Sequence, residues 1–232
     1  FGLFLCTFPD LDFCWHSAIG RREGASMNRL VDAFEGLFTA AAISGGELAK
    51  TAKFTLENVN WRGRLSKPEP MSHPIVDRHL EAACAHSGQH GSSSHRVAEA
   101  LLAVKDRIEW RASYTDRDDE PDMAVFSRNF TATRIIGEGA LLPSDKVKAG
   151  FSLQGRDTYY PPHAHLAEES YWIIGGDGDW RVGTEPWFAV EPGDSIYHES
   201  GARHAMQTNE QALLTVWLWT SHLKSEVMIV RG

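Results

Sequence analysis

Four residues in the second half of the sequence have side chains that could bind a divalent metal ion. His163 and His165 are followed four residues later by Glu169, and a separate histidine, His204, comes much later. Side chains alternate between the two faces of a strand, so His163 and His165 point the same way in extended chain, and Glu169 can approach them if the chain turns back. Imidazole with one carboxylate suits Zn, Fe(II), Mn, Co or Ni. The pattern predicts one divalent metal ion per chain, bound by all four residues.

Aromatic residues near the expected ligands could complete an active site. Tyr171 lies two positions after the glutamate, on the same strand face, so we expect its phenol to point into the metal cavity. A phenol near a divalent cation can lose its proton well below its usual pKa of about 10 and act as a general base. Tyr160 precedes His163, and Trp217 and Trp219 alternate along a late apolar run. Aromatic faces favour a cationic ligand; alternatively, these rings simply fill the core.

The elements that must position these residues are short strands. After about residue 122, β-rich runs are separated by Gly, Pro and Asp turns, such as Pro192-Gly193-Asp194. This alternation is typical of a double-sheet β-barrel. The clearest expected strands are 130–136, 150–153, 179–182 and 212–219.

The first half of the sequence has helical periodicity instead. Between residues 25 and 110, apolar residues recur at steps of three and four, and Gly45-Gly46 offers a stop for the first helix. We therefore predict an α+β fold, with a mainly helical region over 1–122 and a barrel with the metal site over 123–232. The charged stretch 115–122 is expected to be the hinge. The helical layer should cap the barrel mouth or form a dimer contact, and the second alternative predicts a homodimer.

The composition of the chain argues against several classes of protein. The chain has 232 residues, 42% of them hydrophobic, and a formal net charge of -8. The acidic balance argues against a nucleic-acid partner, and no run is apolar enough for a membrane partner. Cys6, Cys14 and Cys84 have no paired spacing and are expected to be reduced packing residues. The first residues lack a basic signal-peptide region, so a cytoplasmic location is expected and the start is assigned no function.

The metal-binding pattern resembles the two motifs of the cupin superfamily. His163, His165, Glu169 and Gly176 match the first motif, although its leading glycine, Gly155, stands two positions too early. The second motif is met by Gly193, Gly201 and His204, with Glu199 where proline is usual and Thr208 where asparagine is usual. The resemblance covers about residues 148–230 and implies a C-terminal cupin double-stranded β-barrel after the helical layer.

The combination H-x-H-x-x-x-E-x-Y with the later His and Trp is similar to the cupin-type dimethylsulfoniopropionate lyases. The length and the N-terminal helices favour their L-type branch. The resemblance implies a lyase that converts dimethylsulfoniopropionate, a small zwitterion, to dimethyl sulfide and acrylate. It also implies that Tyr171 is the catalytic base and that Tyr160 and Trp219 bind the substrate.

Two other classes remain open, because the cupin fold hosts many activities. An Fe(II) dioxygenase acting on a small carboxylate would use the same ligands and keep positions open for oxygen. A ligand-binding cupin without catalysis would keep the barrel but have no competent base. Oxygen uptake with strict iron dependence would identify the first class.

Overall fold

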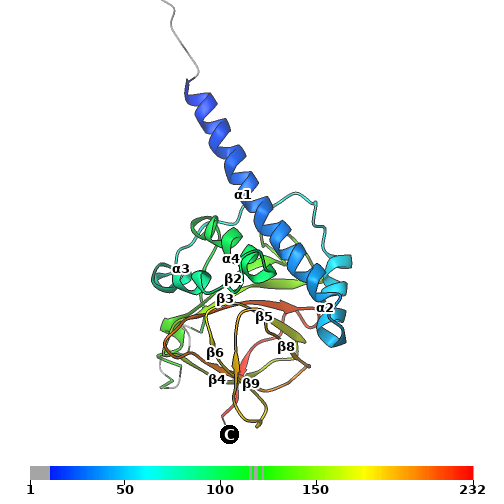
Figure 1. The fold of residues 1–232 in the computed structure, drawn as a ribbon, viewed down its shortest axis with the longest axis vertical. Coiled ribbons are helices and arrows are strands. Elements are labelled where there is room, and N and C mark those ends of the chain that lie inside the picture. Colours follow the sequence, from blue (N-terminus) through cyan, green and yellow to red (C-terminus); the bar gives the residue numbers. More distant parts are fainter. Residues whose placement is uncertain (1–10, 115–116, 118–119, 122, 232) are drawn as a thin grey trace, which may run out of the picture.

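The computed structural model describes residues 11–114, 117, 120–121 and 123–231, with the side chains described from residue 24 onward (Figure 1). Cys6 and Cys14 lie outside the residues whose side chains are described, as does most of the expected hinge, whereas Cys84 is buried and reduced. Helices dominate the N-terminal half. They are α1 (Leu11–Ala41), α2 (Gly46–Asn58), η1 (Val76–Leu80), α3 (Glu81–Ala85), α4 (Ser93–Leu102), η2 (Lys105–Arg107) and, later, η4 (Ser127–Asn129).

Two antiparallel sheets follow the helices. One sheet has the strand order β1-β2-β3-β10-β5-β8 and the other has the order β11-β4-β9-β6-β7. The strands are β1 (Arg111–Ala112), β2 (Phe130–Ile136), β3 (Lys148–Gln154), β4 (Tyr159–Ala164), β5 (Glu169–Gly175), β6 (Gly178–Val182), β7 (Phe188–Val190), β8 (Ser195–His198), β9 (His204–Gln207), β10 (Leu213–Trp219) and β11 (Met228–Ile229). Each of the four strands expected from the sequence is present, and the α+β fold with a cupin barrel is confirmed.

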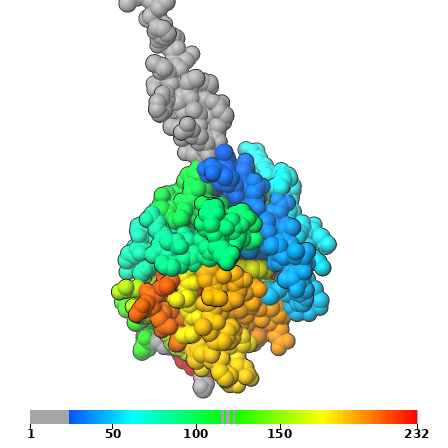
Figure 2. All heavy atoms as spheres, viewed as in Figure 1, coloured from blue at the N-terminus to red at the C-terminus, as the bar shows by residue number. Residues whose placement is uncertain are grey.

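The helices pack on the outer face of the six-stranded sheet, so the molecule has three layers (Figure 1). One apolar cluster contains buried residues of α1, α2, α3 and α4 together with residues of β3, β5 and β10. Figure 2 shows the helical segments, blue to green, lying directly beside the yellow and orange strands. The layer therefore covers a sheet face and not the barrel mouth, which corrects the first of the two expected positions, and the dimer contact stays a prediction. The division at residue 122 stays a prediction, and β1, which precedes it, pairs with β2.

Alternation along β5 divides its side chains between two cores. Trp172 and Ile174 belong to the cluster shared with the helices. Tyr171 and Ile173 belong to a second cluster, which fills the space between the two sheets. Because side chains alternate along a strand, Glu169 shares the inner face with Tyr171. The strand thus presents its carboxylate and its phenol to the barrel interior.

A bulge in β4 brings Tyr160 to the same face as His163. Tyr160 pairs with Met206 of β9, and His163 pairs with His204, so β4 uses one residue more than β9 between these pairs. The two intervening residues are prolines, which have no N–H to donate to the ladder. The extra residue shifts the alternation, and the Tyr160 ring stacks on the His163 ring with centroids 3.8 Å apart.

The shared core makes the helical layer part of the barrel's stability. Phe34 of α1 is fully buried and its ring lies 5.1 Å from that of Phe151 in β3. Phe34→Ala should lower the free energy of unfolding by about 3 to 5 kcal/mol, because a large buried side chain is replaced by a cavity. Denaturant titration would measure the change. Phe54, 38% exposed on α2, provides the control; equal effects of Phe34→Ala and Phe54→Ala would contradict the prediction.

Candidate metal site and active-site cavity

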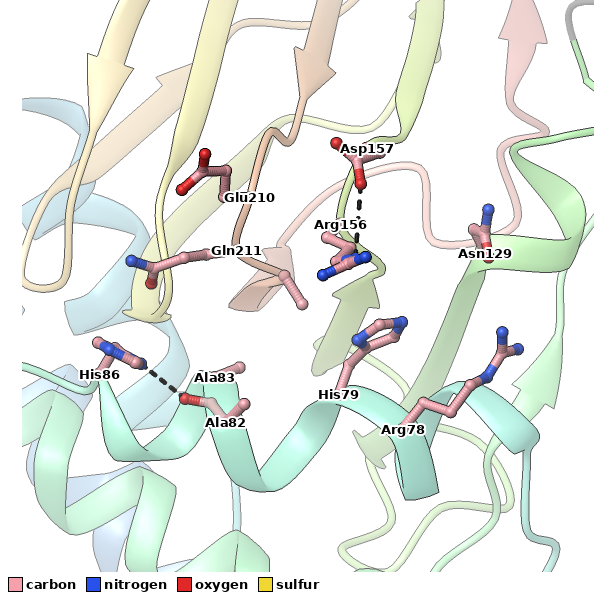
Figure 3. A pocket seen from close by; sticks show the side chains of 11 residues that line it. Arg78, His79, Ala82, Ala83, His86, Asn129, Arg156, Asp157, Glu210 and Gln211 are labelled. Atoms are coloured by element: carbon pink, nitrogen blue, oxygen red, sulfur yellow. Dashed lines mark hydrogen bonds and ion pairs between the residues drawn. The ribbon is translucent and has the colours of Figure 1, made fainter.

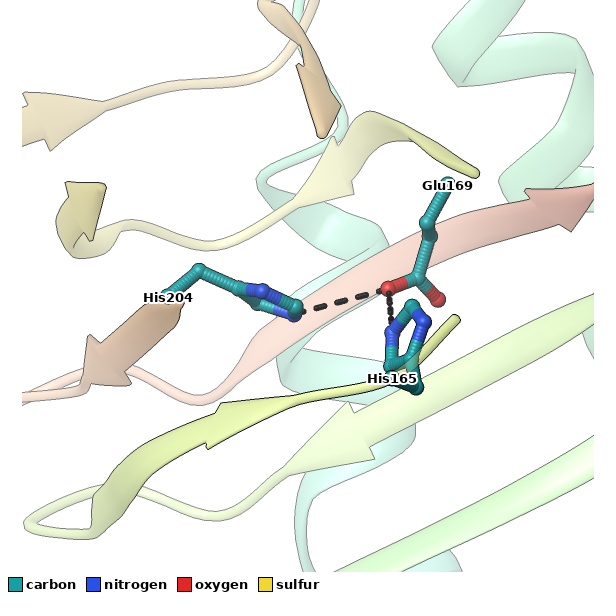
Figure 4. A group of neighbouring side chains, drawn as sticks. All are labelled: His165, Glu169 and His204. Atoms are coloured by element: carbon teal, nitrogen blue, oxygen red, sulfur yellow. Dashed lines mark hydrogen bonds and ion pairs between the residues drawn. The ribbon is translucent and has the colours of Figure 1, made fainter. Parts of the chain in front are cut away.

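His165, Glu169 and His204 converge inside the barrel (Figure 4). Their candidate ligand atoms all lie within 4.8 Å of one another, and all three side chains are buried. Nε2 of His165 lies 2.8 Å from Oε2 of Glu169, and Nε2 of His204 lies 3.5 Å from the same oxygen. Two short connections meet here: His165 and Glu169 stand at the two ends of the β4–β5 connection, and His204 begins β9 after the β8–β9 connection.

His163 lies beside this group but is not part of it. Its ring centroid is 4.0 Å from that of His204 and 6.5 Å from that of His165. Burial, followed by the charge of His204, lowers the pKa of His163 well below 6.5, so its imidazole is neutral and able to bind a metal. The structure therefore brings three of the four expected ligands together, and His163 as a fourth ligand stays a prediction.

The histidines are oriented as metal ligands usually are. Nδ1 of His163, His165 and His204 lies 2.9, 2.9 and 3.0 Å from the backbone oxygens of Pro161, Ala167 and Ala202, respectively. A hydrogen bond from Nδ1 to a carbonyl fixes each ring so that Nε2 is the nitrogen available to a metal. Nε2 of His204 is buried and has no hydrogen-bond partner among the described residues. A buried polar atom without a partner is costly, and a divalent cation at the centre would supply that partner.

The charge balance also suits a cation. Burial raises the pKa of Glu169, but the hydrogen bond from His165 and the nearby charges of His165 and His204 outweigh that effect and hold the pKa well below its usual range. Burial lowers the pKa of His165, whereas its hydrogen bond to Glu169 raises it, and the net shift is upward. Glu169 is thus an ionised carboxylate in the barrel interior. Among the described residues this is also the only group with the spacing of a metal site.

A cavity of about 220 Å³ adjoins the group. Cavities that take drug-sized ligands are about 300 to 1,000 Å³, so this one suits a smaller molecule. All of the site residues expected from the sequence except His204 contribute to its wall, as does Trp217. The lining residues are Arg111, Ser113, Tyr114, Phe130, Ala132, Thr133, Arg134, Lys148, Ser152, Tyr160, His163, His165, Glu169, Tyr171, Trp217, Trp219 and Val227.

The three tyrosines of the cavity are protonated. Burial, then the charge of Glu169, raises the pKa of Tyr171 well above 10. Burial, then the charge of Tyr114, does the same for Tyr160. Burial raises the pKa of Tyr114 to about 12 against the opposing effect of its hydrogen bond to Tyr160. A positive charge beside Glu169 would offset the effect on Tyr171, the tyrosine that follows Glu169 on the inner face of β5.

Tyr160 and Trp219 do more than line the cavity. Both faces of the Tyr160 ring are covered, by Phe126 at 4.0 Å and by His163 at 3.8 Å between centroids. Only the edge and the hydroxyl of Tyr160 are left to meet a ligand. The Trp219 indole N–H donates a hydrogen bond of 2.7 Å to Oε1 of Glu169. Trp219 therefore holds the carboxylate that the sequence assigned to the metal.

This contact gives a prediction for Trp219→Phe. The substitution keeps an aromatic ring but removes the donor, and partners that orient metal ligands are typically worth about 10- to 100-fold in metal affinity or activity. We expect affinity for Zn²⁺ to fall by that factor, as measured by competition with a chromophoric chelator. Trp217→Phe is the matched control, since Trp217 lines the same cavity from the same strand. Unchanged affinity in Trp219→Phe would exclude this role.

Sequence reasoning missed His198. This residue ends β8 and pairs with Glu169 across the ladder. Its ring stacks on that of His204, with centroids 4.0 Å apart and planes 12° apart, and its Nε2 accepts a hydrogen bond of 3.1 Å from the Trp180 indole. Burial, then the charge of His204, lowers the pKa of His198 to about 2, so it is neutral. The sequence signal that could have identified His198 was its position directly before Glu199, which belongs to the second motif.

A second cavity, of about 720 Å³, lies between the helical layer and the loops that precede β4 and β10 (Figure 3). Arg78 and His79 of η1 face Arg156 and Asp157 across it, and Arg156 forms an ion pair of 3.5 Å with Asp157. Two carboxylates, Asp157 and Glu210, line the cavity together with its cations, and it has no group of side chains with metal-site spacing among the described residues. We assign this cavity no function.

No helix in the described part of the chain is both long and apolar enough to span a bilayer. Comparisons with known proteins agree with the fold. The fold resembles a structure from a study of the DMSP lyases RdDddP and RnDddQII, with a TM-score of 0.71 and 23% identity over 90% of this chain and 100% of that one. It also resembles DMSP lyase DddQ from Ruegeria pomeroyi, with a TM-score of 0.68 and 23% identity over 87% and 96% of the two chains.

Sequence relatives come from two branches. The dimethylsulfoniopropionate lyase DddQ of Ruegeria pomeroyi is 30% identical over 56% of this chain, and a putative dimethylsulfoniopropionate lyase DddL of Cereibacter sphaeroides is 28% identical over 53% of it. The matches span 63% and 50% of those two proteins, less than two thirds of either. The model of the dimethylsulfoniopropionate lyase family matches residues 49–215. This match covers more than half of the chain and includes His163, His165, Glu169, Tyr171 and His204, so the chain belongs to the dimethylsulfoniopropionate lyase family.

Proposed function

We propose that this protein is a metal-dependent carbon–sulfur lyase that cleaves dimethylsulfoniopropionate by β-elimination. The observation that carries the proposal is the position of Tyr171, which lines a small cavity together with His165 and Glu169. Family membership supports the substrate, and the convergence of His165, Glu169 and His204 supports the metal. A divalent cation held there would supply positive charge that lowers the pKa of a nearby phenol and stabilises charge developing on the substrate carboxylate.

Tyr171 has the role of general base. Its phenolate takes the proton from the carbon α to the carboxylate, and the electron pair of that C–H bond forms the double bond of acrylate. The bond between the β-carbon and sulfur breaks, and its electron pair leaves on sulfur, which converts the sulfonium to neutral dimethyl sulfide. No acid is needed for the leaving group, because it departs without negative charge. The proton then passes from Tyr171 to solvent.

The surrounding residues bind and orient the substrate. Tyr160 was expected to supply an aromatic face to the sulfonium, but its two faces are occupied by other rings. The Trp219 ring already has the Lys148 ammonium 4.4 Å from its centroid. Tyr114 and Phe130 also line the cavity and are the aromatic groups to which we assign the sulfonium. Tyr160 would act through its hydroxyl, and Trp219 through Glu169.

The test is release of dimethyl sulfide by the purified, metal-loaded protein. We expect headspace chromatography to detect dimethyl sulfide, with acrylate formed in equal amount in solution, because one elimination yields one molecule of each. Glu47→Gln, in an exposed ion pair with Lys50 on α2, is the surface control and should match the wild type. Absence of both products would contradict the lyase function, and oxygen uptake with a small carboxylate would indicate a dioxygenase instead.

A further inference from the structure

Three positive side chains line the active-site cavity. Arg111, Arg134 and Lys148 contribute to its lining, whereas Glu169 is the one carboxylate among the described residues that line it. Arg111 is already paired, because its Nη2 lies 2.8 Å from Oε2 of Glu109. Arg134 and Lys148 form no ion pair with a carboxylate in the described part of the chain. Two cations in the lining of this cavity are thus available to an anion.

Lys148 is held close to the metal-site residues. It pairs with Trp219 across the β3–β10 ladder, and its Nζ lies 4.4 Å from the centroid of the Trp219 ring and 6.0 Å from that of Trp217. Its Nζ also donates to the backbone oxygen of Leu223 at 3.4 Å. Burial, then the charge of Arg134, lowers the pKa of Lys148, whereas Glu169 opposes that shift. The ammonium is half-buried and keeps donor capacity beyond these contacts.

Arg134 also has a hydrogen-bond donor without a partner among the described residues. Its Nη1 donates to the backbone oxygen of Glu138 at 3.1 Å, but its Nε is buried without a hydrogen-bond partner among the described residues. Arg134 and Lys148 also line a third cavity, of about 910 Å³, which we call external because its other lining residues include the exposed Glu138, Asp145 and Lys224. The two cations are therefore shared between the external cavity and the inner one.

We propose that Lys148 and Arg134 form a carboxylate-binding subsite in the lining of the metal cavity, and that this subsite binds and orients the carboxylate of the substrate. Burying unpaired cations costs free energy that a bound carboxylate offsets, and hydrogen bonds between charged groups are stronger than neutral ones. The inference rests on the proposed lyase function for the identity of that carboxylate. A carboxylate has two oxygens, so binding one to Lys148 leaves the other free for a metal ion.

The subsite also determines the direction in which a zwitterion enters. The substrate carries a carboxylate at one end and a dimethylsulfonium at the other, and Lys148 attracts the first and repels the second. The sulfonium is then directed toward the aromatic wall that contains Tyr114 and Phe130. A dimethylsulfonium compound whose carboxylate is esterified should consequently be a poor substrate, because it presents only positive charge to these cations.

Lys148→Met tests the subsite, since methionine keeps an unbranched side chain beside Trp219 and removes only the charge. A lost charge-assisted hydrogen bond is typically worth about 10- to 100-fold in affinity. We expect KM to rise by that factor while kcat changes less than about threefold, because Tyr171 and the metal ligands stay in place. Lys148→Arg restores the charge and should restore most of the affinity. Lys224→Met is the matched control: Lys224 is exposed and lines only the external cavity, so KM should not change.

Binding of acrylate, measured by calorimetry on the metal-loaded protein, gives a readout that does not require turnover. Wild-type protein should bind acrylate more tightly than acrylamide, and Lys148→Met should lose about 10-fold or more of the acrylate affinity. Unchanged KM and unchanged acrylate affinity in Lys148→Met would overturn the subsite. Acrylate binding that depends on Lys148 in a protein that releases no dimethyl sulfide would uphold the subsite and reject the lyase function, so the two failures are distinguishable.

Discussion

Tyr171→Phe should lower the rate of dimethyl sulfide release at saturating substrate by about 10²- to 10⁴-fold, the usual effect of removing a general base. Phenylalanine keeps the ring, and with it the contact to Trp180 at 4.8 Å between centroids. Folding and metal content should therefore stay as in the wild type. The loss should appear in kcat, because the phenol oxygen takes part in proton transfer and not in holding the fold. Rates are measured by headspace chromatography under saturating substrate.

Tyr160→Phe provides the matched comparison within the same cavity. It removes the hydroxyl that bonds Tyr114 but leaves the stacked ring in place between Phe126 and His163. We expect it mainly to raise KM. If Tyr171→Phe keeps more than about a tenth of the wild-type rate, which is less than a general base usually contributes, the proton is taken by another group. A large kcat loss confined to Tyr160→Phe would identify Tyr160 as that group.

Removing one metal ligand should produce the second large effect. His204→Ala deletes a buried imidazole whose Nε2 has no hydrogen-bond partner among the described residues. We expect metal content per chain, measured by elemental analysis, to fall from one ion to a small fraction of one, because each ligand contributes a bond to the cation. Activity should fall with it and should not return when Zn²⁺, Fe²⁺, Mn²⁺, Co²⁺ or Ni²⁺ is added. Full metal occupancy in His204→Ala would remove His204 from the site.

His163→Ala tests whether His163 binds the metal as a fourth ligand, beside the three residues that converge in the structure. If His163 binds the metal, its removal should lower metal content as strongly as His204→Ala. If His163 only supports neighbouring rings, metal content should stay close to one ion per chain. His90→Ala is the control, because His90 lies in the loop before α4 and its ring contacts that of His95, away from the barrel interior.

Local sequence was enough to predict many of the helices and strands and to select the candidate site residues. Strand β2 has the bounds expected from its run of β-branched and apolar residues, and the stop expected at Gly45-Gly46 separates α1 from α2, where Gly45 has a φ of 91° that other residues rarely adopt. These features depend on residues close together in the chain. The same is true of Glu169 and Tyr171, which share a strand face because side chains alternate.

Contacts between distant segments required the tertiary structure. Packing of the helices on the outer sheet face, the hydrogen bond from Trp219 to Glu169 and the stacking of His198 on His204 each join strands or helices whose pairing no local pattern specifies. The bulge at the two prolines of β4 turned Tyr160 toward His163, although regular alternation would have separated their faces. Lys148 lines the cavity beside Trp219 because β3 pairs with β10 in a register that sets the two residues opposite each other. The sequence by itself determined which side chains could bind a metal and move a proton, whereas register and sheet packing decided which of them meet.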